Sequence, residues 1–225
     1  MTLTRADLES NRLKEAFCQG NPEGRVLSDA ELEASLSELL ATHPEGQDIW
    51  VFGYGSLIWN PVFHFEQRQV ARLHGYHRRF CLWSNVGRGT MQRPGLVLGL
   101  DSGGCCRGVA YRIRADHAAE ELRLLWRREM VTGAYCPRWV RATTGETEVP
   151  ALAFIINRNH VQYAGKLSEE IVVRAMVSAR GFLGTPAEYL FETVRSLAEH
   201  GLRDPQLERL ARQVRAALPD AAALA

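Results

Sequence analysis

The sequence predicts an α+β protein in which a small mixed or antiparallel β-barrel is flanked by helices. Three observations predict this class. Helical patterns fill the N-terminal region, short apolar β-prone runs occupy residues 49 to about 157, and helical periodicity returns from 168 to 217. Many short strands in one domain indicate a barrel or a strongly curved sheet. We therefore divide the chain into an N-terminal helical extension (1–46), a barrel domain with C-terminal helices (47–217) and a frayed tail (218–225).

The bulk composition favours a small substrate over a polymeric one. The chain has 225 residues, 46% of them hydrophobic, and its 27 basic and 26 acidic residues give a formal net charge of +1. A nearly neutral protein has no global field to attract nucleic acid or an anionic membrane. We expect neither as a partner.

Cysteine usage and the N-terminus predict a cytoplasmic protein. The five cysteines are odd in number and form no Cys-x-x-Cys pair, which argues against a zinc ribbon and a disulfide framework and fits a reducing cytosol. The N-terminus is charged where a signal peptide needs an apolar core, and no apolar run approaches ~18 residues. The seven histidines show no metal-binding spacing, so we expect neither metal nor cofactor.

Two amphipathic helices are expected in the extension, over residues 4–17 and 28–42. Ser28 and Glu31 have the spacing of a capping box, and four leucines recur on one face of the second helix. We expect this region to pack on the body or on a partner and to carry no catalytic chemistry.

The barrel region contains six expected strands and one helix. The strands are 49–54, 68–76, 79–84, 95–100, 105–113 and 149–157. The helix is expected over 116–129, with Asp116 as its N-cap. Three further helices are expected after the barrel, over 168–180, 186–200 and 204–217.

The first expected strand ends in Gly53-Tyr54-Gly55-Ser56. Two glycines allow positive φ or a close approach by another group, and consecutive free N–H groups in such a turn hold an anion or a carbonyl oxygen. This predicts a substrate-holding loop. A tight bulge or hairpin bend lined with core aromatics is the alternative, and the spacing does not match a nucleotide-binding motif.

Glu129 is the carboxylate most suited to proton transfer. It ends an expected helix, where the macrodipole disfavours negative charge. If its side chain turns into the mouth of the barrel, its pKa would be raised, and it could accept and return a proton. The alternative is an exposed glutamate paired with a neighbouring arginine at 123, 127 or 128.

Other polar residues offer weaker signals. Of Arg78 and Arg79, one points inward and could bind a carboxylate, or both are edge-strand charges. Cys81 and Cys136 lie in apolar strand-like settings, where a thiol is usually inert. The tyrosines at 54, 111, 135 and 189 are possible hydroxyl donors, each otherwise a packing residue.

Taken together, six stretches resemble the ChaC family of glutathione-specific γ-glutamylcyclotransferases. They are WVFGYGSLIW (50–59), GYHRRF (75–80), RGTMQRPG (88–95), GCCRGVAYR (104–112), WRREMVTGAY (126–135) and GTPAEYL (184–190). They occur in the family's order over about residues 49–217, and the first is highly specific in combination with the others. The resemblance implies a β-barrel flanked by helices and cleavage of glutathione to 5-oxoproline and cysteinylglycine without a cofactor.

The resemblance also implies residue roles. It implies that Glu129 is the acid/base residue and gives supporting roles to Arg79, Tyr135 and Tyr189. The γ-glutamyl group would be cradled by Val51, Phe52, Gly53, Tyr54, Gly55, Ser56 and Leu57. Residues 130–132 depart from the Lys-Gly-Gly type of run in one branch, so other γ-glutamyl amino acids or amines remain alternative substrates. A non-catalytic binding or regulatory protein on the same scaffold is a third possibility.

Overall fold

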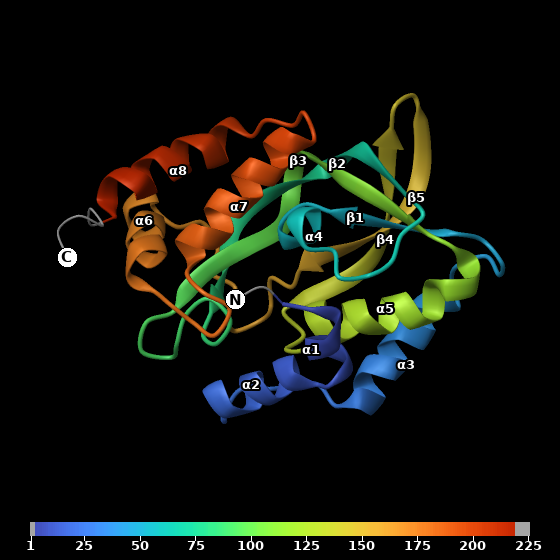
Figure 1. Ribbon diagram of the computed structural model, residues 1–225, viewed down its shortest axis with the longest axis horizontal. Helices are drawn as coiled ribbons and strands as arrows, with labels where there is room; N and C mark the ends of the chain where they lie inside the picture. The colour runs from blue at the N-terminus through green and yellow to red at the C-terminus, as the bar shows by residue number, and fades with distance from the viewer. Residues whose placement is uncertain (1–2, 219–225) are drawn as a thin grey trace.

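A closed five-stranded barrel forms the centre of the molecule in the computed structural model, which describes residues 3–218 (Figure 1). The strands follow the order β1-β3-β2-β4-β5, and the barrel closes through a parallel pairing of β1 with β5. The other neighbours in this order pair antiparallel, so the barrel is mixed, as predicted. The strands are β1 (Ile49–Gly53), β2 (Gln67–Ser84), β3 (Gly95–Ile113), β4 (Tyr135–Thr144) and β5 (Thr147–Ile156).

Strands β2 and β3 are each one long strand where the sequence predicted two. They pair along most of their length, with register irregularities between His74 and Tyr76 and between Phe80 and Leu82. Gly75, Gly103 and Gly104 have φ of +82°, +100° and +79°, and these glycines bend the strands without ending them. Long, bent strands let a barrel close with few elements.

Strand β4 and a short helix, α4 (Ser56–Trp59), were not predicted from the sequence. Strand β4 contains Pro137, which lacks an N–H donor and argues against a central strand. Proline is tolerated because β4 pairs with β5 along its length but with β2 only at Ala142 and Thr143. Helix α4 follows β1 directly, so the Gly-Tyr-Gly-Ser segment is a strand-to-helix turn and not a hairpin.

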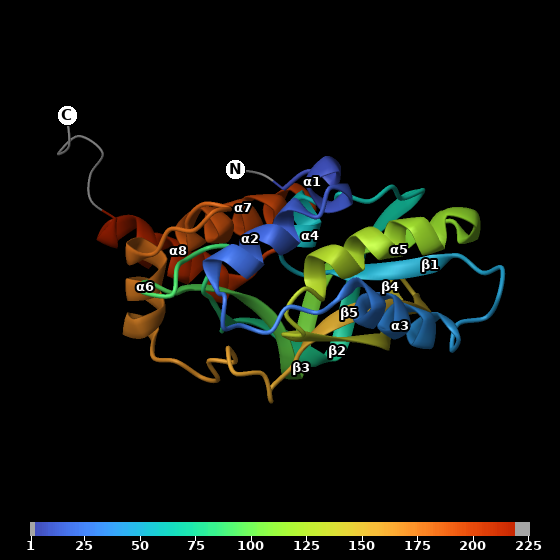
Figure 2. The same cartoon turned by 90° about the horizontal axis from the view of Figure 1, so that it is seen from below.

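The N-terminal extension forms three helices, α1 (Arg5–Glu9), α2 (Arg12–Gly20) and α3 (Asp29–Leu40). The predicted helix over 4–17 is divided because Asn11 adopts a left-handed conformation with φ of 58°. The predicted Ser28–Glu31 capping box is confirmed. Figures 1 and 2 show these helices across the lower side of the barrel, beside α5 (Ala115–Glu129).

Helix α5 packs its apolar face on the barrel through Leu122, Leu125 and Trp126, which are fully buried. The prediction that Asp116 caps this helix is wrong. Arg114 occupies the N-cap position, and Asp116 lies in the first turn, where the Arg114 guanidinium binds it. The predicted C-terminal end at Glu129 is confirmed.

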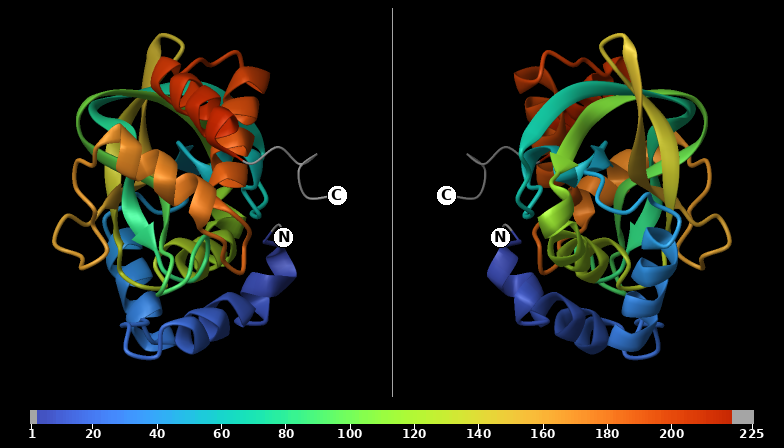
Figure 3. Two further views of the ribbon diagram at one scale, coloured as in Figure 1. Left: turned by 90° about the vertical axis from the view of Figure 1, so that its left-hand side faces the viewer. Right: turned by 90° about the vertical axis from the view of Figure 1, so that its right-hand side faces the viewer.

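Helices α6 (Glu169–Ser178), α7 (Pro186–Glu199) and α8 (Pro205–Ala217) gather on another side of the barrel from the extension (Figure 3). Ser168 and Asp204, the first residues of two of the helices predicted here, are the N-caps of α6 and α8. The tail beyond Leu218 lies outside the described residues. Within residues 3–218, no helix has the length and hydropathy needed to cross a membrane.

Candidate active site

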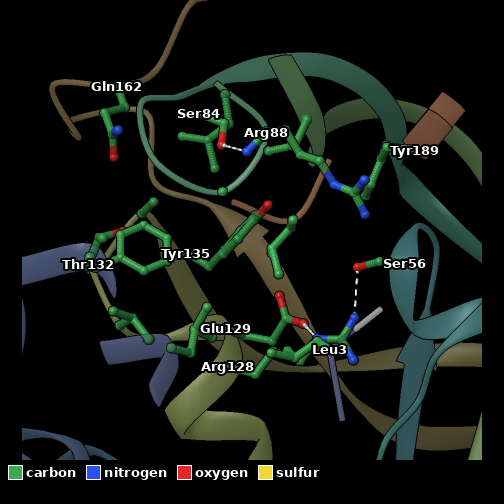
Figure 4. A pocket seen from close by; sticks show the side chains of 18 of the residues that line it. Leu3, Ser56, Ser84, Arg88, Arg128, Glu129, Thr132, Tyr135, Gln162 and Tyr189 are labelled. Carbon is green, nitrogen blue, oxygen red and sulfur yellow. Dashed lines mark hydrogen bonds and ion pairs between the residues drawn. The ribbon is translucent and has the colours of Figure 1, made fainter. Parts of the chain in front are cut away.

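A cavity of about 150 Å³ opens beside the end of α5 (Figure 4). Its lining comes from α4, α5, β2, β3, the start of β4, α7, the loops beside them and the N-terminal extension. A smaller recess leads inward from it and shares four residues with it, Ser56, Glu129, Tyr135 and Tyr189. The inner recess is completed by Tyr54, Gly55, Leu57, Leu98 and Phe154. The two spaces therefore meet at one carboxylate and three hydroxyl groups.

The glycines of the β1–α4 turn are required by close packing. A Cβ atom on Gly55 would lie 2.6 Å from the Tyr189 hydroxyl oxygen. A Cβ on Gly53 would lie 3.2 Å from both Leu57 Cβ and Tyr111 Cε2. Neither glycine has a positive φ. Of the two explanations that the sequence left open for these glycines, close approach by another group is the one observed.

Glu129 points its carboxylate into the cavity from the last position of α5 (Figure 4). Its side chain is 13% exposed. Burial raises the pKa of Glu129, and the charge and hydrogen bond of Arg128 act in the opposite direction without cancelling this effect. The alternative from the sequence was an exposed glutamate paired with a neighbouring arginine. The carboxylate does pair with Arg128, but inside the cavity and not on the surface.

Arg128 connects three parts of the site. Its Nε lies 2.9 Å from Glu129 Oε1, and its Nη2 donates to Ser56 Oγ at 2.9 Å. Its Nη1 donates to the backbone carbonyl of Asn60. With only 7% of its side chain exposed, Arg128 fixes the end of α5 against both ends of α4. From the sequence, this arginine was expected only as an ion-pair partner of Glu129.

The tyrosines around the recess are held as neutral hydroxyl groups. Tyr54 donates to the Phe154 carbonyl and Tyr135 to the Leu98 carbonyl, both at 2.9 Å. Burial raises the pKa of Tyr54, Tyr135 and Tyr189, so none of them ionises near neutral pH. Tyr111 lies behind the site, where its hydroxyl donates to the Ile58 carbonyl at 3.1 Å and supports α4.

The comparisons with known proteins agree on one family. The ChaC-like protein family model matches residues 49–217. A glutathione-specific γ-glutamylcyclotransferase from Escherichia coli (strain K12) is 40% identical over 210 residues, which cover 92% of this chain and 90% of the relative. The chain belongs to the ChaC-like family.

Other relatives and a solved structure agree with this assignment. Glutathione-specific γ-glutamylcyclotransferase 1 from Rattus norvegicus is 34% identical to this ChaC-like chain over 82% of it and 89% of the relative. A crystal structure of a γ-glutamylcyclotransferase specific to glutathione from yeast superposes with a TM-score of 0.71. At 23% identity, over 76% of this chain and 97% of the yeast chain, that match supports the barrel fold.

The ChaC-like structure brings together some of the predicted site residues and separates others. Glu129, Tyr54, Gly55, Ser56, Leu57, Tyr135 and Tyr189 line the cavity or its recess. Val51, Phe52 and Gly53 lie in β1, where the first two are fully buried in the barrel core. Arg79 is not among the lining residues, because it forms an ion pair with the buried Asp101. Its neighbour Arg78 faces α8 and lies 3.3 Å from Asp204.

Arg88 is a cavity residue that the sequence analysis did not single out. Its guanidinium lies 5.9 Å from the ring centre of Trp59 and 5.5 Å from that of Tyr189. Its Nη1 donates to the Thr185 carbonyl at 3.3 Å and is 3.9 Å from Glu188. Only 8% of the residue is exposed, and burial lowers its pKa. The run RGTMQRPG contained this arginine, but no local pattern placed it in the same cavity as Glu129.

Metal ligation and a cysteine nucleophile are two other chemistries for which the side chains of this ChaC-like chain can be checked. Within residues 3–218, no group of three His, Cys, Asp or Glu side chains gathers to hold a metal ion. Cys81 is buried, and burial raises the pKa of its thiol to about 11, which disfavours the nucleophilic thiolate. Cys136 is half-buried in β4 and does not line the cavity.

Proposed function

We propose that this ChaC-like protein is a glutathione-specific γ-glutamylcyclotransferase, a lyase that converts glutathione into 5-oxoproline and cysteinylglycine. The observation that carries the proposal is the buried carboxylate of Glu129, which stands where an inner recess meets an outer cavity. Its raised pKa suits a group that accepts and returns a proton. The name and 40% identity of the Escherichia coli relative support the choice of reaction and substrate.

The reaction closes a ring within the substrate. The free α-amine nitrogen of the γ-glutamyl group forms a bond to the carbonyl carbon of its own γ-carboxamide, and the amide bond from that carbonyl carbon to the cysteine nitrogen breaks. Holding the folded conformer exploits the large effective molarity of intramolecular attack. The amine attacks in its neutral form and loses one proton as the ring closes. Glu129 accepts this proton and delivers it to the departing nitrogen, which leaves as the amine of cysteinylglycine. No water, redox partner or cofactor is consumed.

The γ-glutamyl group would occupy the inner recess. Its walls supply the hydroxyls of Tyr54, Tyr135 and Tyr189 and the start of α4 at Ser56. The N–H groups of a first helical turn have no intrahelical acceptor, so they can bind the α-carboxylate or the developing oxyanion. Val51, Phe52 and Gly53 would act from behind, as the strand that sets the position of this turn.

The remaining half of glutathione would extend into the outer cavity. There Arg88 offers a buried guanidinium flanked by two aromatic rings, a suitable partner for the terminal carboxylate of the glycine. Arg79 would contribute indirectly, because it pairs with the Asp101 carboxylate. The hydroxyl of Tyr163 also donates to this carboxylate, and Tyr163 is next to Gln162 in the cavity wall. The five free cysteines suit a reducing cytoplasm, where glutathione is kept as the thiol.

Turnover of glutathione by Glu129→Gln tests the proposal. Glutamine keeps the shape of the side chain and cannot act as a base, so we expect kcat to fall by ~10²-fold or more. Glu120→Gln is the matched control, because Glu120 lies on the same helix but is exposed. Both variants should melt close to the wild type, and 5-oxoproline should be followed by mass spectrometry.

The substrate panel distinguishes the alternatives. Val131 and Thr132, from the run that departs from Lys-Gly-Gly, line the outer cavity, so other γ-glutamyl amino acids and amines belong in the panel. A preference for one of these over glutathione would revise the substrate. If no γ-glutamyl compound yields 5-oxoproline with the wild type, the enzymatic proposal fails and a binding or regulatory role replaces it.

A further inference from the structure

The N-terminal extension forms one wall of the outer cavity. Leu3, Leu13 and Phe17 line it, although they lie far from Glu129 in the sequence. From sequence alone this region was expected to pack on the body or on a partner and to carry no catalytic chemistry. Figure 2 shows α2 crossing the lower side of the molecule, and Leu13 and Phe17 are the residues of this helix that reach the cavity.

Specific contacts fix this wall to the helix that carries Glu129. Arg5 Nη1 lies 2.7 Å from Glu121 Oε2 of α5, and the Glu121 side chain is only 3% exposed. From the same helix, Arg127 Nη1 donates to the carbonyls of Leu8 and Glu9. Leu8 and Leu13 are buried in a small apolar cluster with Leu124 and Val131. The extension is therefore a built part of the cavity.

The far end of α2 contacts the loop that carries Arg88. A Cβ atom on Gly20, the last residue of α2, would lie 2.9 Å from the Val86 methyl groups. Helix α2 thus spans the cavity from the end of α5 to the segment beside Arg88. A substrate that extends from Glu129 toward Arg88 must pass along this helix.

The two parts of the site differ in chemistry. The extension contributes only apolar side chains, and all of them line the outer cavity while none lines the inner recess. The recess holds the hydroxyl groups and shares Glu129 with the cavity. Beyond the scissile amide, a substrate therefore meets an apolar wall from α2 on one side and the cation of Arg88 further out.

We infer that Leu13 and Phe17 determine leaving-group selectivity, by favouring γ-glutamyl peptides with an apolar side chain directly after the scissile amide. This inference rests on the proposed function. The cysteine of glutathione supplies a short –CH2–SH side chain of low polarity, which packs well on leucine and aromatic carbon. A glycine at the same position leaves the wall facing water. One small apolar group in a pocket changes specificity by roughly 10-fold or more.

The experiment compares kcat/KM for γ-Glu-Cys-Gly and γ-Glu-Gly-Gly, using the full chain and its Phe17→Ala variant. We expect the wild type to prefer the cysteine peptide and Phe17→Ala to reduce this preference by about 5- to 10-fold. The loss should fall on glutathione, with γ-Glu-Gly-Gly changed by less than about twofold. Phe17→Leu, which keeps an apolar side chain, should retain most of the preference. Gln19→Ala, at the exposed end of α2, should behave as the wild type.

Binding of the leaving dipeptides separates this inference from the proposed reaction. Titration calorimetry with cysteinylglycine and glycylglycine measures how tightly each dipeptide binds, without any turnover. Tighter binding of cysteinylglycine that weakens in Phe17→Ala supports the inference even if 5-oxoproline is never formed. An unchanged preference in Phe17→Ala, or an equal loss for both peptides, overturns it. Thermal melts distinguish the loss of a substrate contact from release of the extension from the barrel. Phe17 is only half-buried, so Phe17→Ala should melt close to the wild type. Leu13 is buried, so Leu13→Ala should melt at a lower temperature if the extension is released.

Discussion

Gly55→Ala should damage the site through one atomic contact. The new Cβ would lie 2.6 Å from the Tyr189 hydroxyl oxygen, and the next atoms are Leu98 Cδ1 and Cβ at 3.6 and 3.7 Å. The second and third distances are ordinary van der Waals contacts, so the clash comes from the hydroxyl alone. Tyr189 is 6% exposed, and its ring contacts Trp59 and Phe80, which limits how it can move.

The cost follows from overpacking a filled space. Inserting one methyl group into a packed core costs about 1–3 kcal/mol of unfolding free energy. We expect Gly55→Ala to lose about 2 kcal/mol in urea unfolding and to reduce kcat/KM for glutathione by at least ~10-fold, since Tyr189 must shift out of the recess. In a Tyr189→Phe background the hydroxyl is absent, so the same substitution should cost under about 0.5 kcal/mol.

A double-mutant cycle of Gly55→Ala and Tyr189→Phe measures this coupling directly. Tyr189→Phe alone serves as the reference, because it removes the hydroxyl without filling the space. The reasoning is refuted if Gly55→Ala is as stable as the wild type. It is also refuted if the loss is the same in both backgrounds, since the clash would then lie elsewhere.

Three further predictions concern charged groups. Arg128→Met removes the cation that lowers the pKa of Glu129, so this pKa should rise. The acid limb of the pH profile of kcat/KM should then move to higher pH. An unshifted acid limb would show that Arg128 does not change the pKa of this carboxylate. Burial tends to raise the pKa of Asp101, but bonds from Arg158, Tyr163 and the Ser102 N–H outweigh it and lower that pKa. The wild type should therefore lose stability as the pH falls through the folded pKa, below 3.8. Asp101→Asn should cost about 3 kcal/mol in unfolding at pH 7 and flatten this acid dependence, whereas an unchanged pH profile would contradict the assignment. Arg88→Gln should reduce kcat/KM by roughly 10- to 100-fold for glutathione but far less for its glycine ethyl ester, and an equal loss for both would exclude contact with the carboxylate.

Local patterns were sufficient for most of the fold. Capping residues and apolar periodicity placed the helices from 168 to 217 within a few residues, and the break at Gly53–Ser56 was found where β1 meets α4. The errors arose where tertiary context overrides local chemistry. Glycines 75, 103 and 104 bend continuous strands, and Pro137 is accepted on a side of β4 that has no ladder partner.

The site was predicted less completely than the fold. Glu129 could be found because a carboxylate at a helix C-terminus conflicts with the helix dipole, a conflict visible in the sequence. Arg88 and the wall from Leu13 and Phe17 have no local signal, since they reach the cavity only through the packing of distant elements. Arg79 was chosen by resemblance, and its partner Asp101 follows from the register of β2 on β3, which local patterns do not specify.

The most direct test of the account is the fate of the γ-glutamyl group when the wild-type protein acts on glutathione in ¹⁸O-labelled water. Intramolecular attack predicts 5-oxoproline and cysteinylglycine in equal amounts, with no ¹⁸O in either product. Free glutamate carrying ¹⁸O would show that water attacks the γ-carbonyl carbon, which contradicts the cyclotransferase mechanism.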